Sequence, residues 1–125
     1  LLETENNKQA EWRTDPNRNG LAGCMGDIGT HAFNMVEYVT GLKVSHVCAD
    51  LYIKIDGRPI DDDGVVLLRF ENGASGVLMA SQTDTGCENN LKLRVYGETG
   101  GLEWEQELNN TLIRREPTGP AHTLR

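Results

Sequence analysis

The stretch Gly23–Gly41, GCMGDIGTHAFNMVEYVTG, decides how the rest of the chain is organised. Asp27 and His31 stand four residues apart in it, a spacing that places both side chains on one face of a helix. Gly41 is typical of the residue that ends a helix. We therefore predict a helix from about Asp27 to Thr40. In no other part of the sequence does the spacing force residues capable of proton chemistry together.

Two parallel lines of side chains run along this predicted helix. The polar line consists of Asp27, His31, Asn34 and Tyr38. The apolar line has the same offsets and consists of Ile28, Ala32, Met35 and Val39. This pattern predicts a core stripe with a solvated stripe beside it. An aspartate in the first turn is often only a cap or a charge that the helix dipole favours, and a histidine one turn on is often only an ordinary helix residue.

Four glycines recur at every third position around the start of the helix: Gly20, Gly23, Gly26 and Gly29. Glycine lets another body, such as a ring or a sugar, approach the backbone closely. A mobile loop with spare glycines is the alternative interpretation. The run is not the G-x-G-x-x-G of dinucleotide-binding proteins, and no apolar strand precedes it. We therefore predict no cofactor-binding residue in this chain.

Composition narrows the class of protein. The chain has 125 residues and a formal net charge of −7, which argues against nucleic acid as a partner. No apolar run approaches the length of a membrane span. Acidic runs at Asp61–Asp63 and Glu103–Glu107 are predicted to be solvated faces. Because the sequence begins at Leu1 without a methionine, we expect a piece of a larger protein.

Three cysteines, Cys24, Cys48 and Cys87, form no C-x-x-C pair. Reduced thiols in a cytoplasmic protein are the simplest interpretation. A metal site of Cys24, Asp27 and His31 is conceivable, but one thiolate and one imidazole make a weak zinc set. We predict no metal ligand.

Residues after Lys43 have the pattern of strands. Strands are predicted at 44–55, 64–70, 74–82, 91–96, 102–107 and 111–115, with an irregular tail at 117–125. Asn72-Gly73 predicts a hairpin turn. One helix packed on a largely antiparallel sheet of about six strands gives an α+β single domain.

Two predicted strands, Val65–Leu68 and Val77–Ala80, are apolar on both faces. A strand of this kind is covered on both sides, and the helix can cover only one. We therefore expect the open sheet face to meet a second subunit, giving a homo-oligomer, or a segment outside this sequence.

These features together resemble the C-terminal domain of the glucose–fructose oxidoreductase / inositol dehydrogenase / rhizopine-catabolism (Gfo/Idh/MocA) family. The resemblance covers about residues 9–116. It is carried by Trp12-Arg13, the glycine run, Gly26-Asp27-Ile28-Gly29-Thr30-His31, Arg94-Val95-Tyr96-Gly97 and Gly100-Gly101-Leu102-Glu103-Trp104. It implies a dihydrodipicolinate-reductase-like C-terminal domain.

The resemblance also implies a function. Residues 1–125 would be the substrate-binding and oligomerisation part of an NAD- or NADP-dependent oxidoreductase, whose N-terminal Rossmann domain is absent from this sequence. The substrate would be a sugar or polyol, oxidised or reduced at a secondary alcohol by hydride transfer. His31 would be the acid/base group, assisted by Asp27. Trp12, Arg13 and Asn34 would contact substrate, although the family often has aspartate where Asn34 stands.

The proposed chemistry suits these residues, because an alcohol carbon gives up hydride only as its hydroxyl loses a proton. An imidazole can accept that proton near neutral pH. Two other classes stay open: a non-catalytic interaction module that uses the two-sided sheet, and a metal-dependent hydrolase or lyase built on Cys24, Asp27 and His31.

Overall fold

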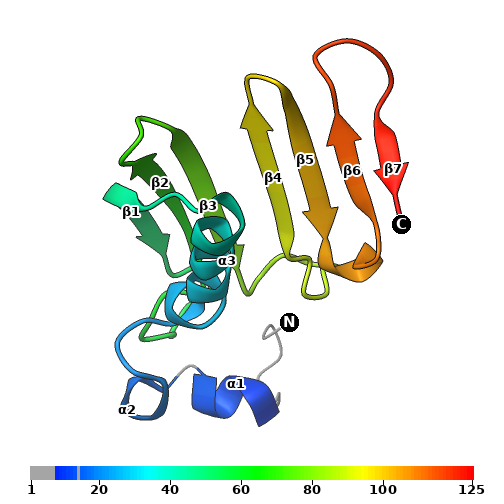
Figure 1. Ribbon diagram of the computed structural model, residues 1–125. Helices are drawn as coiled ribbons and strands as arrows, with labels where there is room; N and C mark the ends of the chain where they lie inside the picture. The colour runs from blue at the N-terminus through cyan, green and yellow to red at the C-terminus, as the bar shows by residue number, and fades with distance from the viewer. Residues whose placement is uncertain (1–7, 14) are drawn as a thin grey trace. The chain divides into compact units, whose positions relative to one another are not determined.

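The computed structural model describes residues 8–13 and 15–125. The chain divides into two compact units, with the boundary between Gly86 and Cys87. Unit 1 contains the α-helices, the π-helix and a three-stranded sheet, and unit 2 contains a four-stranded sheet with one 3-10 helix (Figure 1). In the described part of the chain, no helix is long and apolar enough to span a membrane.

Unit 1 begins with helical segments and continues into strands. Its elements are α1 (Lys8–Arg13), α2 (Pro16–Asn19), η1 (Met25–Gly29), α3 (Thr30–Thr40), β1 (Val44–Tyr52), β2 (Asp63–Phe70) and β3 (Ser75–Ser81). The segment η1 is a π-helix that runs directly into α3. The two together confirm the predicted helix and start it two residues earlier.

The C-terminal end of α3 forms as the sequence predicts. Gly41 adopts a left-handed conformation with φ 68°, and its amide donates to the carbonyl of Glu37 at 2.9 Å. The Glu37 carboxylate accepts hydrogen bonds from the Val44 amide and from Lys43, both at 2.9 Å. These contacts, the Val44 amide above all, lower the pKa of Glu37. The helix end is thereby attached to the first residue of β1.

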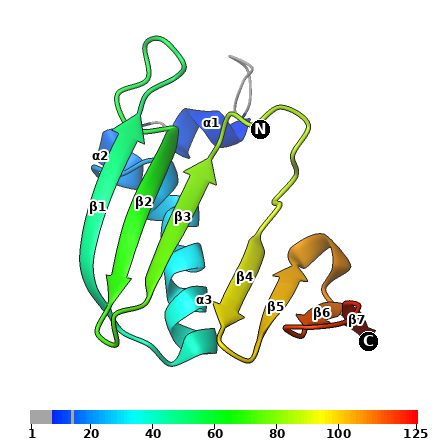
Figure 2. The ribbon, with the colours of Figure 1, turned by 90° about the horizontal axis from the view of Figure 1, so that it is seen from above.

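The strands of unit 1 pair antiparallel in the order β1-β2-β3. The hairpin between β2 and β3 forms at the predicted Asn72-Gly73, where Gly73 has φ 90° and the Asn72 side chain accepts the Ala74 amide at 3.1 Å. Figure 2 shows α3 running along one face of this sheet. The core therefore lies between α3 and the inner face of β2 and β3.

The buried cluster of this core is Val66, Leu68, Phe70 and Leu78. The helical residues packed against it include Met25, Ala32, Phe33 and Val36. The predicted apolar line was therefore wrong except at Ala32; Val39 is 51% exposed. The π turn is wider than an α turn and breaks the α-helical offset between Ile28 and Ala32. Within α3 the residues that pack on the core are Ala32, Phe33 and Val36, so the predicted line lay on the wrong side of Ala32.

The outer face of the same sheet is also apolar, as the two-sided strands predicted. Leu67 lies opposite Cys48 on β1 and opposite Val77 on β3. The exposed fractions of Leu67 and Val77 are 52% and 63%, and that of Met79 is 74%. Three large apolar side chains therefore share one exposed surface, which we call the outer sheet face.

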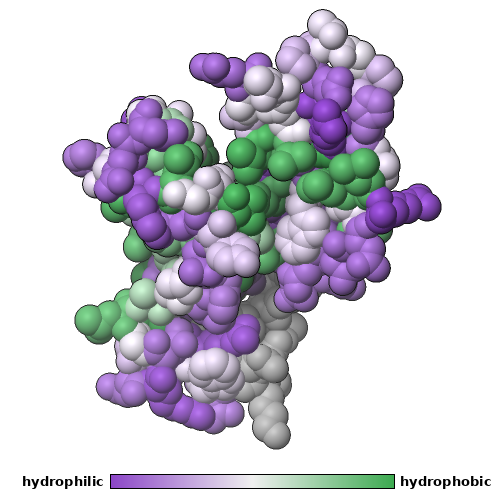
Figure 3. Space-filling view, in the orientation of Figure 1, coloured by the Kyte–Doolittle hydropathy of each residue, from purple (hydrophilic) through white to green (hydrophobic). Residues whose placement is uncertain are grey.

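Unit 2 is a single antiparallel meander. Its elements are β4 (Lys92–Gly97), β5 (Gly100–Glu105), the 3-10 helix η2 (Gln106–Leu108), β6 (Leu112–Arg115) and β7 (His122–Leu124), paired in the order β4-β5-β6-β7. Apolar residues alternate along the strands, with Leu102 opposite Val95 and Leu112 opposite Trp104. Figure 3 shows hydrophobic surface crossing these strands.

The α+β class and the antiparallel pairing are thus confirmed. The structure differs in having seven described strands in two sheets, where the sequence predicted about six in one sheet. The additional strand is β7, in the tail predicted to be irregular. Its three residues form a strand because they pair with β6, with Leu124 opposite Leu112.

Leu68→Ala tests the position of this core, and Leu67→Ala is its matched control. Leu68 is 1% exposed, whereas the adjacent Leu67 lies half exposed on the other face. We expect Leu68→Ala to lower the free energy of unfolding by about 2–5 kcal/mol. Leu67→Ala should lower it by less than about 1 kcal/mol. The measurement is urea denaturation at low protein concentration, and equal losses would show that the inner face is misassigned.

Candidate functional site

The candidate site begins where the glycine-rich loop enters η1. Asp61, in the loop between β1 and β2, holds this point with three hydrogen bonds. Its Oδ1 accepts the Gly23 amide at 2.7 Å, its Oδ2 accepts the Met25 amide at 2.8 Å, and its backbone carbonyl accepts the Cys24 amide at 2.8 Å. The carboxylate satisfies amides that a helix start leaves without an intrahelical acceptor.

Packing within unit 1 requires glycine at position 23, in this loop, and leaves little room beside Gly29 in η1. A Cβ at Gly23 would lie 2.0 Å from the carbonyl oxygen of Asp61. A Cβ at Gly29 would lie 2.3 Å from the sulfur of Met25. The bodies that approach these two glycines are therefore parts of the chain itself. The interpretation that the glycines leave room for a ring or sugar is not needed at either position.

The π turn is stabilised by the side chain that follows it. The Thr30 amide donates to the Met25 carbonyl, five residues earlier. The Thr30 hydroxyl donates to the carbonyls of Gly26 and Asp27, at 2.9 and 3.1 Å. Asp27 thus lies in the wide turn itself, and His31 lies in the first turn of α3. Insertions of this kind are frequent at functional sites.

Asp27 is held by a residue far from it in the sequence. Its Oδ2 lies 3.4 Å from Nη1 of Arg13, and both side chains are about one-third exposed or less. The Arg13 guanidinium in turn lies over the Trp12 ring, 5.2 Å from its centre. Trp12 is 37% exposed, so it is a stacking partner for Arg13 and does not anchor the core. The structure therefore brings Trp12, Arg13 and Asp27 together.

His31 and Asn34 lie on α3 and are both exposed, as is Tyr38. The predicted polar line therefore faces away from the core. The ion pair joins Asp27 to Arg13 directly. His31 and Asn34 are placed near Asp27 only because they follow it along the same helix. The arrangement presents a carboxylate beside a guanidinium, then an accessible imidazole and an accessible amide.

Cys24 is fully buried at the start of the helix. Burial raises the pKa of its thiol to about 12, with Asp61 the next contributor. Among residues 8–13 and 15–125, no three His, Cys, Asp or Glu side chains group as metal ligands. The Cys24, Asp27 and His31 metal site is therefore wrong.

The acidic run Asp61–Asp63 is not a solvated face. Asp62 is 1% exposed, and its carboxylate accepts the Lys54 amide at 2.7 Å, the Ile55 amide at 3.1 Å and Arg58 Nη1 at 3.2 Å. Asp63 is paired with the Lys54 ammonium at 2.6 Å. The run looked solvated because sequence does not show which partners surround a carboxylate. Asp61 is the site-forming residue that sequence reasoning missed.

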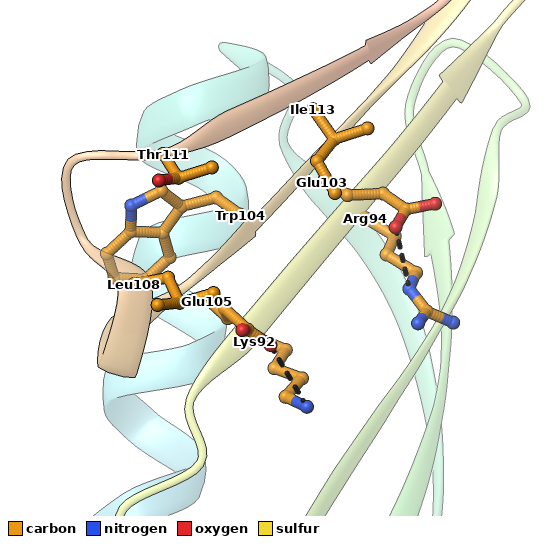
Figure 4. A pocket seen from close by; sticks show the side chains of 8 residues that line it. All are labelled: Lys92, Arg94, Glu103, Trp104, Glu105, Leu108, Thr111 and Ile113. Atoms are coloured by element: carbon orange, nitrogen blue, oxygen red, sulfur yellow. Dashed lines mark ion pairs between the residues drawn. The ribbon is translucent and has the colours of Figure 1, made fainter. Parts of the chain in front are cut away.

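Unit 2 has a shallow groove of its own (Figure 4). It is lined by Lys92, Arg94, Glu103, Trp104, Glu105, Leu108, Thr111 and Ile113. Its charges are matched in pairs: Lys92 with Glu105 at 3.1 Å and Arg94 with Glu103 at 3.8 Å. The hydrogen bond from Arg115, at 2.8 Å, is the main cause of the lowered pKa of Glu103. In the acidic run Glu103–Glu107, the carboxylates of Glu103 and Glu105 are therefore paired with cations of the neighbouring strands.

Residues 2–103 match the family described as the GFO/IDH/MocA C-terminal domain. The chain is 27% identical over 157 residues to levoglucosan dehydrogenase of Pseudarthrobacter phenanthrenivorans, which covers 90% of this chain and 40% of that protein. It is 30% identical over 102 residues to myo-inositol 2-dehydrogenase of Thermotoga maritima, covering 78% of this chain and 30% of that protein.

Among solved structures, an inositol dehydrogenase homolog from Azotobacter vinelandii in complex with NAD+ superposes with a TM-score of 0.91 at 28% identity. The match covers 96% of this chain and 31% of that one. The chain therefore spans between about three-tenths and two-fifths of the length of these proteins. The Azotobacter vinelandii homolog has also been solved in complex with NADH and myo-inositol, and levoglucosan dehydrogenase in complex with NADH and levoglucosan.

The buried Cys24 generates a test of the site that needs no substrate. In protein dilute enough to leave the outer sheet face uncovered, iodoacetamide at about pH 8 should alkylate the exposed Cys48 rapidly and Cys24 at least about 100-fold more slowly. Burial denies access to Cys24, and its thiolate forms only as the pH approaches the raised pKa. Peptide mass spectrometry of the folded protein measures both rates, with urea-unfolded protein as the control. Equal rates in the folded state would contradict the burial of the helix start.

Proposed function

Because the chain belongs to the GFO/IDH/MocA C-terminal domain family, we propose that it is the substrate-binding and oligomerisation domain of a longer NAD(P)-dependent oxidoreductase. The reaction is hydride transfer to or from a secondary alcohol of a sugar or polyol. The observation that carries the proposal is the geometry of the helix: Asp27 is fixed by Arg13 in the π turn, and the exposed His31 stands in the next turn.

In this proposal His31 exchanges the proton of the reacting hydroxyl. Oxidation of an alcohol carbon needs a base for that proton, and reduction of the carbonyl needs an acid, and imidazole serves as either near neutral pH. Asp27 orients the hydroxyl or the imidazole. The ion pair with Arg13 supports this role, because it restricts the rotation of a carboxylate that is otherwise about a quarter exposed.

The substrate contacts in this proposal are Trp12, Arg13 and Asn34. The stacked pair of Trp12 and Arg13 offers an apolar ring and a cation beside Asp27. The buried Nε of Arg13 has no hydrogen-bond acceptor among the described residues, which supports an acceptor supplied by a substrate hydroxyl. Asn34 is exposed on the same helix as His31 and offers an amide.

The residues described here do not fit a dinucleotide cradle. Every pair of described strands is antiparallel, whereas the dinucleotide fold needs parallel strands joined by a helix. We therefore assign NAD or NADP binding mainly to another part of the longer protein. The nicotinamide would exchange the hydride, and this chain would handle the proton and hold the substrate.

The outer sheet face supports the oligomerisation role, with a second copy of this chain as its occupant. The face carries Leu67, Val77 and Met79 near its middle, and Asp50 and Arg69 belong to it on opposite sides of Leu67. A two-fold axis near Leu67 would bring Arg69 of one copy towards Asp50 of the other, so the face is complementary to itself in charge as well as apolar.

Val77→Lys tests this face, and Tyr38→Lys is the control with the same added charge. Val77 is 63% exposed on the outer sheet face, and Tyr38 is 86% exposed on α3. We expect the unaltered chain to form a defined dimer, Val77→Lys to shift it to monomer and Tyr38→Lys to leave the dimer unchanged. Sedimentation velocity measures the distribution between monomer and dimer for each protein. An unaltered chain that stays monomeric at high concentration would contradict the proposal. So would a longer protein in which another segment of the same chain covers the outer sheet face.

His31→Ala in the longer protein tests the catalytic role. We expect kcat to fall by about 10²–10⁴-fold, the usual loss for a positioned general base. Because His31 is exposed, the free energy of unfolding should fall by about 1 kcal/mol or less. The measurements are thermal melts and NADH formation with myo-inositol and levoglucosan as probes.

Two further variants complete that test. Asp27→Asn should also lower kcat, with a larger loss of stability because it breaks the ion pair with Arg13. Tyr38→Phe, on the same helix and distant by two turns from His31, should leave turnover unchanged. A His31→Ala protein that melts many degrees lower but turns over normally would make His31 a structural histidine and the catalytic role wrong.

A further inference from the structure

The loop between β1 and β2 is attached to the sheet through Asp62, the residue next to Asp61. The Asp62 amide donates to the Tyr52 carbonyl at 3.0 Å, and the Asp62 carbonyl accepts the Gln82 amide at 2.8 Å. Its buried carboxylate closes the loop by accepting the amides of Lys54 and Ile55. The position of the Asp61 backbone is therefore set, through the adjacent Asp62, by the ends of β1 and β3.

Asp61 transmits this fixed position to the start of the helix. Both carboxylate oxygens and the backbone carbonyl are used, by the amides of three consecutive residues, Gly23 to Met25. The Gly23 carbonyl then accepts the Asp27 amide at 3.0 Å, and the Met25 carbonyl accepts the Thr30 amide that closes the π turn. Asp61 is thus one hydrogen-bonded step from Asp27 and from the turn that precedes His31.

We propose that Asp61 is a positioning residue, which sets the place of Asp27 and His31 relative to the rest of unit 1 without touching substrate. The inference rests on the proposed function of those two residues. The π turn makes the position sensitive, because a slip of one hydrogen bond from the i+5 to the i+4 pattern would rotate α3 relative to Asp27. Displacement of a catalytic group by about 1 Å can cost about 10²-fold in rate.

The neighbouring carboxylate provides a matched control. Asp63 is also mostly buried, and its side chain pairs with the Lys54 ammonium at 2.6 Å, whereas the Asp61 side chain binds the helix start. Removing either carboxylate should lower stability. Only removal of Asp61 should move Asp27 and His31, which separates positioning from a general loss of folding free energy.

The experiment compares Asp61→Ala, Asp61→Asn, Asp63→Ala and Asp63→Asn in the longer protein, well below their melting temperatures. We expect Asp61→Ala to lower kcat by about 10–100-fold while KM changes less than about threefold. Asp61→Asn should lose less, because its single side-chain oxygen still accepts one of the two amides. Both Asp63 variants should keep kcat within about twofold of the unaltered protein.

A second readout works without turnover and covers an Asp61→Ala protein that fails to fold. Nuclear magnetic resonance of the His31 ring and the Asp27 amide should show shifted resonances in Asp61→Asn and unshifted ones in Asp63→Asn. Unshifted resonances in Asp61→Asn, or an Asp61→Ala protein with normal kcat beside an inactive His31→Ala protein, would overturn this inference alone. A His31→Ala protein with normal turnover would overturn the proposed function and this inference with it.

Discussion

The binding of three consecutive backbone amides by Asp61 is the interaction on which the arrangement of unit 1 depends. A helix start exposes amides that need acceptors, and here one residue of a distant loop provides them. The same contact closes the core, because Met25 packs from the helix start against the buried residues of β2 and β3. Where the helix begins, how it packs and which side chains it exposes are therefore set together.

The sequence alone was sufficient to predict those parts of the fold that depend only on residues adjacent in the chain. The stop at Gly41, the hairpin at Asn72-Gly73 and the helix after the glycine run each follow from the conformations that a few adjacent residues allow. The role of Asp61 could not be predicted in this way, because its partners lie 36 and 38 residues earlier and a carboxylate in an acidic run has the same local signature whether it is solvated or buried.

The candidate site was predictable in part for the same reason. The spacing of Asp27 and His31 places them on one helix, but the ion pair of Asp27 with Arg13 joins two helical segments and leaves no periodic pattern. The π turn also has no simple signature, and the spacing from Asp27 to His31 was counted across it as if it were an α turn. The division of the strands into two sheets depends on which strands pair, which alternation within each strand does not specify.

The close approach at Gly23 also constrains how this sequence can change over evolution. A Cβ there would meet the Asp61 carbonyl at 2.0 Å, and the amide of the same glycine is bound by the Asp61 carboxylate. A residue larger than glycine is acceptable at position 23 only if the loop at Asp61 moves away. A loop that has moved no longer supports the start of the helix. A Cβ at position 23 is excluded whatever side chain residue 61 carries, because the atom that it would meet belongs to the backbone.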